Sequence, residues 1–203
     1  MRRMSMDKKK IGVVILAAGG SLRLGEPKQL LNFRGKSLLE NAIMAAENSE
    51  CCCFVLVLGG NEDLIKRKLN FGQIPLISNP DWEKGMSGSL QLGLSYLQQS
   101  NILDAVLLML ADQPYVDHLL LNQMIRKFSM TNKEIVACAY NGTLGVPCIF
   151  GKTFFPDLFA LSQQEGAKKI IQIHKQEAAV VEYPLAAIDI DTWEDYVALL
   201  KME

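Results

Sequence analysis

The sequence predicts an α/β fold, a single-domain Rossmann-like three-layer sandwich in which helices cover both faces of a mostly parallel sheet. Three observations predict it. The length of 203 residues suits one domain of roughly 100–200 residues. Apolar residues make up 49% of the chain and charged residues 21%, so a buried core can form. Short apolar runs alternate with segments of helical period along most of the chain.

The strands are predicted from runs of consecutive apolar residues, which are typical of parallel strands buried on both faces. Three early runs show this pattern most clearly, and they cover residues 13–18, 54–58 and 105–111. Weaker runs extend the sheet at residues 135–139, near 146–150, and near 180–183 or Ile188.

The helices are predicted between these strands from capping residues and from the spacing of apolar side chains. Ser37 and Glu40 have the spacing of a capping box, which opens a helix that reaches about Asn48. Asn61 is expected to cap a helix that ends near Leu69. Further helices are expected at 86–99, 118–128 and 193–200, the last with Trp193, Tyr196, Val197 and Leu200 on one apolar face.

Residues 1–10 are expected to form a disordered tail, and residues 11–203 a single domain without an internal linker. The basic residues before Ile11 imitate a secretory signal, but the apolar stretch runs into a glycine-rich segment with chemistry of its own. The longest apolar run, 105–111, is far shorter than the roughly 18 residues of a membrane span. We therefore expect a protein without a membrane partner.

Charge and cysteine content narrow the function classes further. A formal net charge of -1 gives no general attraction to nucleic acid. The five cysteines form no C-x-x-C pair, and only two histidines accompany them, so neither a zinc site nor a disulfide framework is favoured. Cys51, Cys52 and Cys53 are expected to be buried at the start of a strand. Reduced thiols suit a cytoplasmic location.

The glycine-rich segment from Leu16 to Lys28 follows the first strand, where open α/β sheets bind ligands. Its glycines allow a backbone nest for an anion, and Arg23 and Lys28 are expected to bind a triphosphate and to assist catalysis. A solvated glycine-rich turn is the alternative. The expected nucleotide-binding residues here are Leu16, Ala17, Ala18, Gly19, Gly20, Ser21, Arg23 and Lys28.

Two common phosphate-binding motifs do not match this segment. A P-loop requires Gly-Lys-Ser/Thr after the four-residue spacer, but Gly25 is followed by Glu26 and Pro27. The dinucleotide motif Gly-x-Gly-x-x-Gly is also absent, so hydride transfer is not predicted.

Asp112 directly follows the apolar run 105–111 and is expected to bind Mg²⁺, which takes one or two carboxylates together with substrate phosphates. A turn-forming aspartate is the alternative. Asp191 is favoured as a second ligand over Asp189, because residues 188–191 alternate like a strand end and Asp191 is nearer the exit. Either carboxylate could instead serve the cap of the helix that follows.

Ser87 and Ser89 lie where a loop enters a predicted helix, and they are expected to contact the nucleotide or to cap that helix. Gly93 within the same helix costs about 1 kcal/mol relative to alanine, which indicates a close approach by another group. Trp82 and Met86 could line a pocket or belong to the core.

These segments resemble the MobA-like nucleotidyltransferases, which mature molybdenum cofactor, and most resemble the cytidylyl-transferring branch of that family. The resemblance covers nearly the whole chain after residue 10. The motifs that carry it are Leu-Ala-Ala-Gly-Gly-Ser-Leu-Arg-Leu-Gly-Glu-Pro-Lys at 16–28, Lys-Gln-Leu-Leu at 28–31, Asn-Pro-Asp-Trp at 79–82, Gly-Met-Ser-Gly-Ser-Leu at 85–90, Leu-Ala-Asp-Gln-Pro at 110–114, Gly-Val-Pro at 145–147 and Asp-Ile-Asp-Thr at 189–192.

The resemblance implies a nucleotidyltransferase-type sandwich that uses Mg²⁺ to transfer CMP from CTP to the phosphate of molybdopterin, with release of pyrophosphate. It supports Asp112 as a metal ligand and implies acceptor binding by Gly145, Pro147 and Lys168. This chain has Gln164 where the family often has an acidic residue, which weakens the acceptor assignment.

Base and acceptor leave alternatives open. Ala18 stands where guanylyl-transferring relatives usually have glycine, so CTP is favoured over GTP. The acceptor could be another phosphorylated small molecule. The protein could also be a non-catalytic carrier that delivers molybdenum cofactor to a molybdenum hydroxylase, although a carrier has no use for Arg23, Lys28 and Asp112 together.

Overall fold

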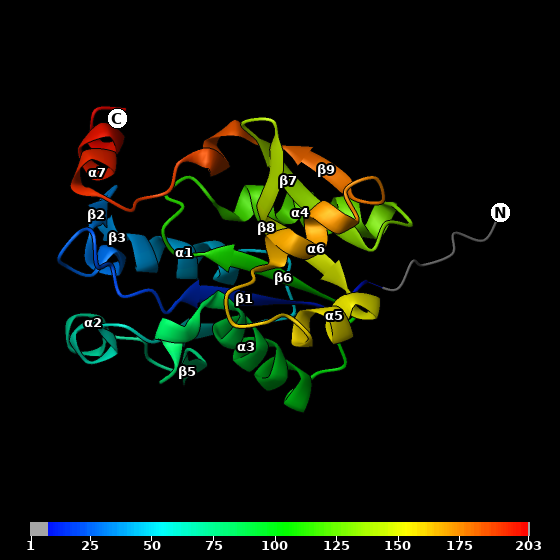
Figure 1. The fold of residues 1–203 in the computed structure, drawn as a ribbon, viewed down its shortest axis with the longest axis horizontal. Helices are drawn as coiled ribbons and strands as arrows, with labels where there is room; N and C mark the ends of the chain where they lie inside the picture. The colour runs from blue at the N-terminus through cyan, green and yellow to red at the C-terminus, as the bar shows by residue number, and fades with distance from the viewer. Residues whose placement is uncertain (1–7, 203) are drawn as a thin grey trace.

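A computed structural model describes residues 8–202, and its centre is one seven-stranded sheet in the order β5-β4-β1-β6-β8-β7-β9 (Figure 1). Neighbouring strands are parallel except for β8, which runs antiparallel to both β6 and β7. The predicted mostly parallel α/β fold is confirmed. The strands are β1 (Ile11–Ala17), β4 (Cys53–Leu58), β5 (Leu76–Ser78), β6 (Ala105–Leu110), β7 (Ile135–Tyr140), β8 (Thr143–Gly151) and β9 (Ala179–Glu182).

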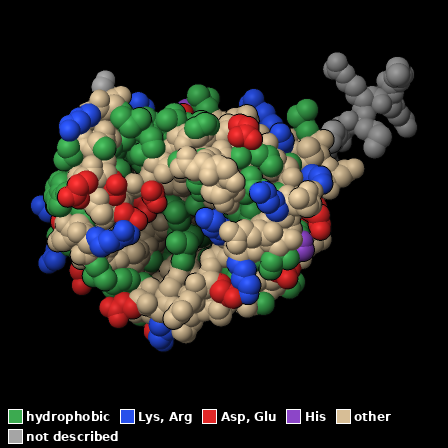
Figure 2. Space-filling view, turned by 45° about the horizontal axis from the view of Figure 1, so that its top comes forward, with side chains coloured by type: hydrophobic (Ala, Val, Ile, Leu, Met, Phe, Trp, Pro, Cys, Tyr) green, Lys and Arg blue, Asp and Glu red, His purple; other side chains and the backbone are tan. Residues whose placement is uncertain are grey.

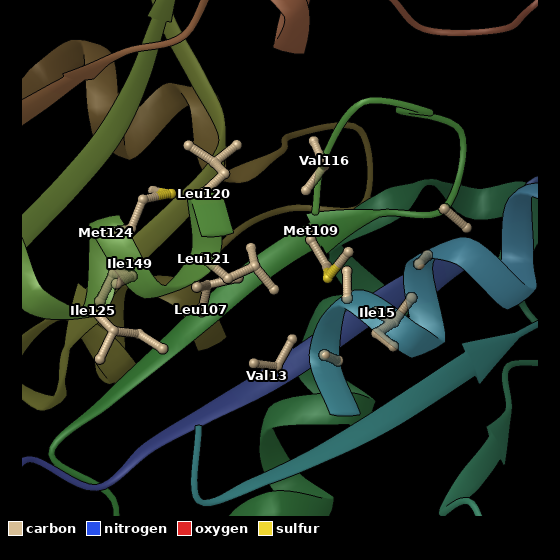
Figure 3. Close-up of a cluster of buried hydrophobic side chains, with 14 of the residues drawn as sticks. Val13, Ile15, Leu107, Met109, Val116, Leu120, Leu121, Met124, Ile125 and Ile149 are labelled. Atoms are coloured by element: carbon tan, nitrogen blue, oxygen red, sulfur yellow. The ribbon is translucent and has the colours of Figure 1, made fainter. Parts of the chain in front are cut away.

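Helices cover both faces of this sheet. On one face, α1 (Leu38–Glu47) packs on β1 and β4, and α4 (His118–Met130) packs on β7, β8 and β9. Their buried side chains join those of β1 and β6 in one cluster (Figure 3). On the other face lie α3 (Met86–Ser100), α5 (Phe155–Phe159) and α6 (Ala167–Ile173). Successive β1 side chains such as Ile15 and Leu16 pack into the clusters on opposite faces of the sheet, so both faces of the strand are buried.

A small lobe at one end of the molecule brings distant parts of the chain together (Figure 1). It contains the hairpin of β2 (Asn32–Phe33) and β3 (Lys36–Ser37) and the C-terminal helix α7 (Trp193–Leu200). Its buried cluster consists of Leu24, Leu31, Phe33, Leu38, Ile190 and Leu199. The glycine-rich segment therefore shares a core with the segment that carries Asp191.

The remaining elements are short. Helix α2 (Glu62–Lys68) follows β4, and single 3₁₀ turns form η1 (Lys28–Leu30), η2 (Trp82–Lys84), η3 (Lys152–Phe154) and η4 (Pro184–Ala187). None of the helices among residues 8–202 is long and apolar enough to cross a membrane.

Several local predictions are wrong. Residues 188–191 form no strand, because η4 and a loop follow β9. The predicted apolar face of α7 is largely exposed, with Trp193 at 44% and Leu200 at 44%, and the buried side chain is Leu199 at 1%. Cys52 is exposed, and its neighbours Cys51 and Cys53 are half-buried, because β4 begins only at Cys53.

The cap expected for α2 and the extent of the expected N-terminal tail also differ from the structure. Asn61 precedes α2 but makes no side-chain cap, and its backbone adopts the left-handed conformation, with φ 61°. Residues 1–7 of the expected tail lie outside the described residues. Lys10 is anchored, because its N–H donates to Asp104 Oδ2 at 2.8 Å and its carbonyl accepts from Asp104 N at 2.8 Å.

Candidate active site

A cavity of about 310 Å³ opens at the carboxyl ends of β1 and β6, the edge at which the sequence predicts a ligand. Figure 2 shows a hollow with an apolar floor and with charged side chains gathered along its rim. The lining includes the predicted site residues Leu16, Ala17, Ala18, Gly19, Lys28, Ser89 and Asp112, together with Gln29, Trp82 and Met86.

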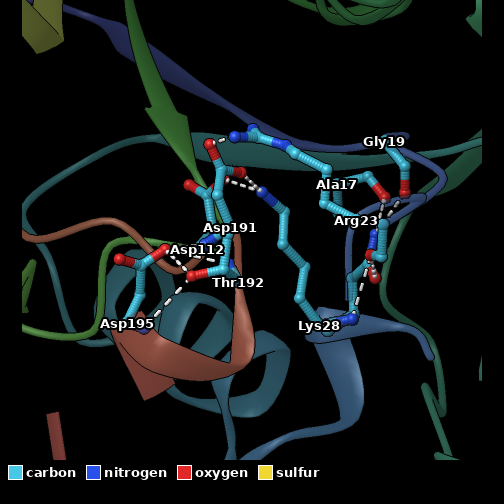
Figure 4. A network of polar contacts seen from close by, with 10 residues as sticks. Ala17, Gly19, Arg23, Lys28, Asp112, Asp191, Thr192 and Asp195 are labelled. Carbon is cyan, nitrogen blue, oxygen red and sulfur yellow. Dashed lines mark hydrogen bonds and ion pairs between the residues drawn. The ribbon is translucent and has the colours of Figure 1, made fainter. Parts of the chain in front are cut away.

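The predicted cations and carboxylates meet in one network beside this cavity (Figure 4). Lys28 Nζ lies 2.5 Å from Asp112 Oδ2 and 2.7 Å from Asp191 Oδ1. Arg23 Nη2 lies 2.5 Å from Asp191 Oδ2. The loops after the parallel neighbours β1 and β6 and the turn before α7 each supply one part of the network.

The electrostatic balance favours the charged forms of Lys28 and Asp191. Burial lowers the pKa of Lys28, but the charges and hydrogen bonds of Asp112 and Asp191 outweigh it, so the pKa lies above its usual value. Burial raises the pKa of Asp191, but Lys28 and then Arg23 outweigh it and hold the pKa below its usual value. The pKa of Asp189 is raised by burial and then by Asp112 and Asp191, because like charges oppose its ionisation.

The donor set fits a hard divalent cation that is completed by substrate. Asp112 Oδ1 is buried and has no hydrogen-bond partner within residues 8–202, so it lacks the donor or cation that a buried carboxylate oxygen needs. Over the same residues, no group of three or more His, Cys, Asp or Glu side chains could hold a metal ion. Asp112 and Asp191 would therefore share the ion with phosphate oxygens and water, as is usual for Mg²⁺.

The family is decided by a direct match. Residues 13–180 match the model of the MobA-like NTP transferase domain. The chain belongs to this family. It is a nucleotidyltransferase of the MobA-like type, and the match includes both the glycine-rich segment and Asp112.

Curated relatives of this nucleotidyltransferase carry different names. The molybdenum cofactor cytidylyltransferase of Escherichia coli (strain K12) is 26% identical over 190 residues, which cover 92% of this chain and 94% of that protein. The purine catabolism protein PucB of Bacillus subtilis (strain 168) is 29% identical, with 90% and 92% covered. Nicotine blue oxidoreductase of Paenarthrobacter nicotinovorans is 36% identical, but the match spans only 50% of this chain and 48% of that protein.

Solved structures of relatives share the fold, and one of them contains manganese. The crystal structure of Rv0371c from Mycobacterium tuberculosis H37Rv superposes with a TM-score of 0.80 and 28% identity, covering 96% of this chain and 99% of that one. A second structure of Rv0371c, in complex with manganese, has a TM-score of 0.76 at 27% identity and covers 96% and 100%. A relative of this nucleotidyltransferase thus binds manganese.

Glycine is required at different positions of the glycine-rich segment for different physical reasons. A side chain at Gly19 would meet no atom within 4 Å, so this position leaves the backbone open to a ligand. A Cβ at Gly20 would lie 2.3 Å from the Trp82 ring, so glycine is needed there for packing instead. Gly25 adopts φ +78°, a conformation that L side chains rarely take. Ser21 Oγ accepts from Lys28 N at 3.0 Å, which folds the segment back on itself.

The two serines at the start of α3 have different surroundings in the structure. Gly85 precedes the helix without a side-chain cap, so the alternative role of these serines as caps is wrong. Ser89 Oγ accepts from Asn79 Nδ2 at 2.8 Å and lines the cavity, whereas buried Ser87 lines a neighbouring hollow. The close approach expected at Gly93 is that of β1, because a Cβ there would lie 2.5 Å from Val14 Cγ1.

The predicted acceptor residues do not line the cavity. Gly145 and Pro147 belong to β8, and Lys168 lies in the first turn of α6. Packing explains Gly145, because a Cβ there would lie 2.1 Å from the Tyr140 hydroxyl, which donates to Val146 O at 3.1 Å. Their role in acceptor binding stays a prediction.

Gln29 is a functional candidate that sequence reasoning missed. Its side chain is 2% exposed, lines the cavity and donates to two carbonyls of the glycine-rich segment. The signal in the sequence is its place in the Lys-Gln-Leu-Leu motif at 28–31, where only the adjacent Lys28 was given a role.

Proposed function

We propose that this nucleotidyltransferase transfers CMP from CTP to the phosphate of molybdenum-bound molybdopterin. The observation that carries the proposal is the placement of Lys28 between Asp112 and Asp191, beside the open backbone of Gly19. This arrangement offers cations to a triphosphate and carboxylates to a metal in one network beside the cavity. The similarity to the molybdenum cofactor cytidylyltransferase over 92% of the chain supports the choice of acceptor.

The reaction needs positioning more than it needs a protein nucleophile. An acceptor phosphate oxygen attacks the α-phosphorus, the bond from that phosphorus to the bridging α–β oxygen breaks, and pyrophosphate leaves with the electron pair. Arg23 and Lys28 stabilise the charge on the departing pyrophosphate. We propose Mg²⁺ as the cation held by Asp112 and Asp191, where it supplies charge neutralisation on the phosphate oxygens when bound.

Substrate binding must rearrange the ion pairs of the protein. Arg23 and Lys28 are both paired with carboxylates in the absence of substrate. A triphosphate and a divalent cation arriving together replace each pair with a new partner of the right sign, so neither charge is left alone. Binding of nucleotide without metal is therefore expected to be weak.

The nucleotide base and the recipient of the product complete the proposal. Ala18 lines the cavity, and we propose that its methyl group limits the space for the base, which favours a pyrimidine over a purine. A molybdenum hydroxylase is proposed as the recipient of the dinucleotide cofactor.

The deciding experiment mixes the protein with Mg²⁺, molybdopterin and either CTP or GTP, and measures pyrophosphate release and the dinucleotide product. We expect release that requires the metal and the acceptor and that is faster with CTP. Release with methylerythritol phosphate or a sugar phosphate instead of molybdopterin would change the acceptor, and binding of the cofactor without release would indicate a carrier.

A parallel assay tests the reaction class that the name of one relative suggests. The nicotine blue oxidoreductase match covers half of this chain, so the protein is also incubated with NADH or NADPH and nicotine blue. Oxidation of the nicotinamide without nucleotidyl transfer would overturn the proposed function.

A further inference from the structure

The buried amide of Gln29 holds two carbonyl groups of the turn formed by residues 17–20, which we call the carbonyl turn. Gln29 Nε2 donates to Ala17 O at 2.8 Å and to Gly19 O at 2.9 Å. The Oε1 atom of the same side chain accepts from Ser21 Oγ at 3.3 Å. One side chain that is 2% exposed therefore bonds to residues 17, 19 and 21.

The loop after β4 holds the other two carbonyls of the carbonyl turn. Gly60 N donates to Ala18 O at 2.8 Å, and Asn61 Nδ2 donates to Gly20 O at 2.9 Å. The two loops touch closely, because a Cβ at Gly60 would lie 2.5 Å from Gly20 Cα. Asn61 is exposed and adopts φ 61°, a conformation that asparagine and glycine tolerate best.

The backbone carbonyls and the backbone N–H groups of this segment thus differ in whether they have hydrogen-bond partners. All four carbonyls of residues 17–20 are occupied by protein donors. The backbone N–H groups of residues 19–23 have no acceptor anywhere in residues 8–202. Successive unpaired N–H groups in a glycine-containing turn form an anion-binding concavity. The bound carbonyls cannot turn toward the cavity and repel an anion there.

We propose that Gln29 and Asn61 are positioning residues, which fix the carbonyl turn so that the N–H groups of residues 19–23 face the phosphates of the nucleotide. The identity of the anion rests on the proposed function, whereas the holding of the turn does not. Asn61 lies on a loop 41 residues away in sequence, so the β4–α2 loop becomes part of the phosphate site without contacting substrate.

The sharpest variant is Asn61→Gly, because glycine keeps the positive φ and removes only the amide. The matched control is Asn101→Ala, which removes a similar bond from Asn101 Nδ2 to Leu97 O, 3.1 Å long, at the far end of α3. Gln29→Leu is a second test, but it leaves buried carbonyls unpaired and can unfold the protein. The exposed Asn61 keeps the proposal testable.

The first measurement needs no ligand. Two amides report on the segment, because Gly60 N donates to Ala18 O and Lys28 N donates to Ser21 Oγ. We expect Asn61→Gly to accelerate hydrogen exchange at both amides by about tenfold, with a melting temperature close to that of Asn101→Ala, and Asn101→Ala to leave both rates unchanged. Unchanged rates in Asn61→Gly would overturn the proposal.

The second measurement uses Mg²⁺ with inorganic pyrophosphate, and then CTP. We expect Asn61→Gly to raise the dissociation constant of pyrophosphate and the KM for CTP by about tenfold, with kcat within about twofold, because the turn holds the phosphates equally in ground and transition states. Faster exchange with unchanged pyrophosphate affinity would also overturn the proposal. Failure of the wild type to bind either anion would overturn the proposed function instead, and the exchange rates would still decide whether Asn61 holds the turn.

Discussion

At the scale of single residues, the two oxygens of Asp112 have different surroundings. Oδ2 is 2.5 Å from Lys28 Nζ, while Oδ1 is buried without a partner in the described part of the chain. A carboxylate kept for packing or for a turn would satisfy both oxygens. The asymmetry favours a role for Oδ1 in binding a ligand.

Asp112→Asn is expected to reduce kcat of pyrophosphate release by more than the roughly 10–100-fold that loss of an outer-sphere metal partner costs. The amide cannot supply the negative charge, while Lys28 keeps Asp191 as a partner, so the fold survives. Steady-state kinetics and circular dichroism measure the two effects. Retention of most metal-dependent activity would place the metal elsewhere.

Ala18→Gly is expected to relax the preference for CTP over GTP by about 1 kcal/mol, the low end of the roughly 1–3 kcal/mol that one methyl group discriminates. Removal of the methyl frees volume in the cavity without touching the phosphate site. Competition between the two nucleotides gives the ratio of kcat/KM. An unchanged ratio would move base recognition away from this residue.

At the scale of elements, the capping boxes of α1 and α7 have different consequences. In α1, the Ser37 and Glu40 pair that the sequence predicts is present. In α7, Thr192 and Asp195 form a second box, and Asp195 Oδ2 also accepts from Asp191 N at 3.1 Å. The cap that begins α7 therefore also orients the backbone of a proposed metal ligand.

Thr192→Ala is expected to lower the free energy of unfolding by about 1 kcal/mol, as is typical for a lost cap. We also expect weaker binding of pyrophosphate with Mg²⁺, because Asp191 loses its orientation. Denaturant titration and calorimetry measure the two effects. Thr192→Ser keeps the hydroxyl and serves as the control, so equal losses in both variants would contradict the role of the cap.

Glu40→Gln is expected to make stability less dependent on pH in acid. The side-chain and backbone hydrogen bonds of Ser37 lower the pKa of Glu40 below its usual value, against a smaller opposing effect of burial. Its contribution is complete above the unfolded pKa of about 4.3 and is lost as the pH falls through the lower folded pKa. Unfolding titrations from pH 6 to pH 3 compare the slopes, and parallel curves would show that Glu40 contributes nothing.

At the scale of the whole molecule, the small lobe connects the segment that follows β1 with the C-terminal helix α7. Leu24 and Leu31 from the segment around the proposed phosphate site pack with Ile190 and Leu199. This cluster is much smaller than the two that flank the sheet, so each of its side chains matters more to the geometry of Asp191.

Leu199→Ala is expected to lower the free energy of unfolding by about 2–5 kcal/mol, because the side chain is 1% exposed and its loss leaves a cavity. Leu200→Ala, at a side chain that is 44% exposed, is the control. Denaturant titration of both variants gives the difference. Equal losses would mean that α7 packs with its predicted face after all.

The sequence predicted the sheet because its long strands are continuous apolar runs, whereas β2, β3 and β5, of two or three residues, are too short to show a pattern. The alternation of apolar and acidic residues at 188–191 suggested a strand, but these residues form a loop. Lys28, Asp112 and Asp191 were predicted from their places beside strand ends and in the family motifs. The roles of Gln29 and Asn61 were not predicted, because they depend on carbonyl groups that only the folded turn presents.

The Lys28 contacts also bear on the order of folding. Lys28 meets Asp112 across 84 residues and Asp191 across 163 residues. Contacts between such distant residues form late, because the entropy of closing the intervening chain must be overcome first. A chain that is still being synthesised therefore has no complete site until the segment that bears Asp191 has been made and has docked. Nucleotide binding can then serve as a signal that folding of this protein is finished.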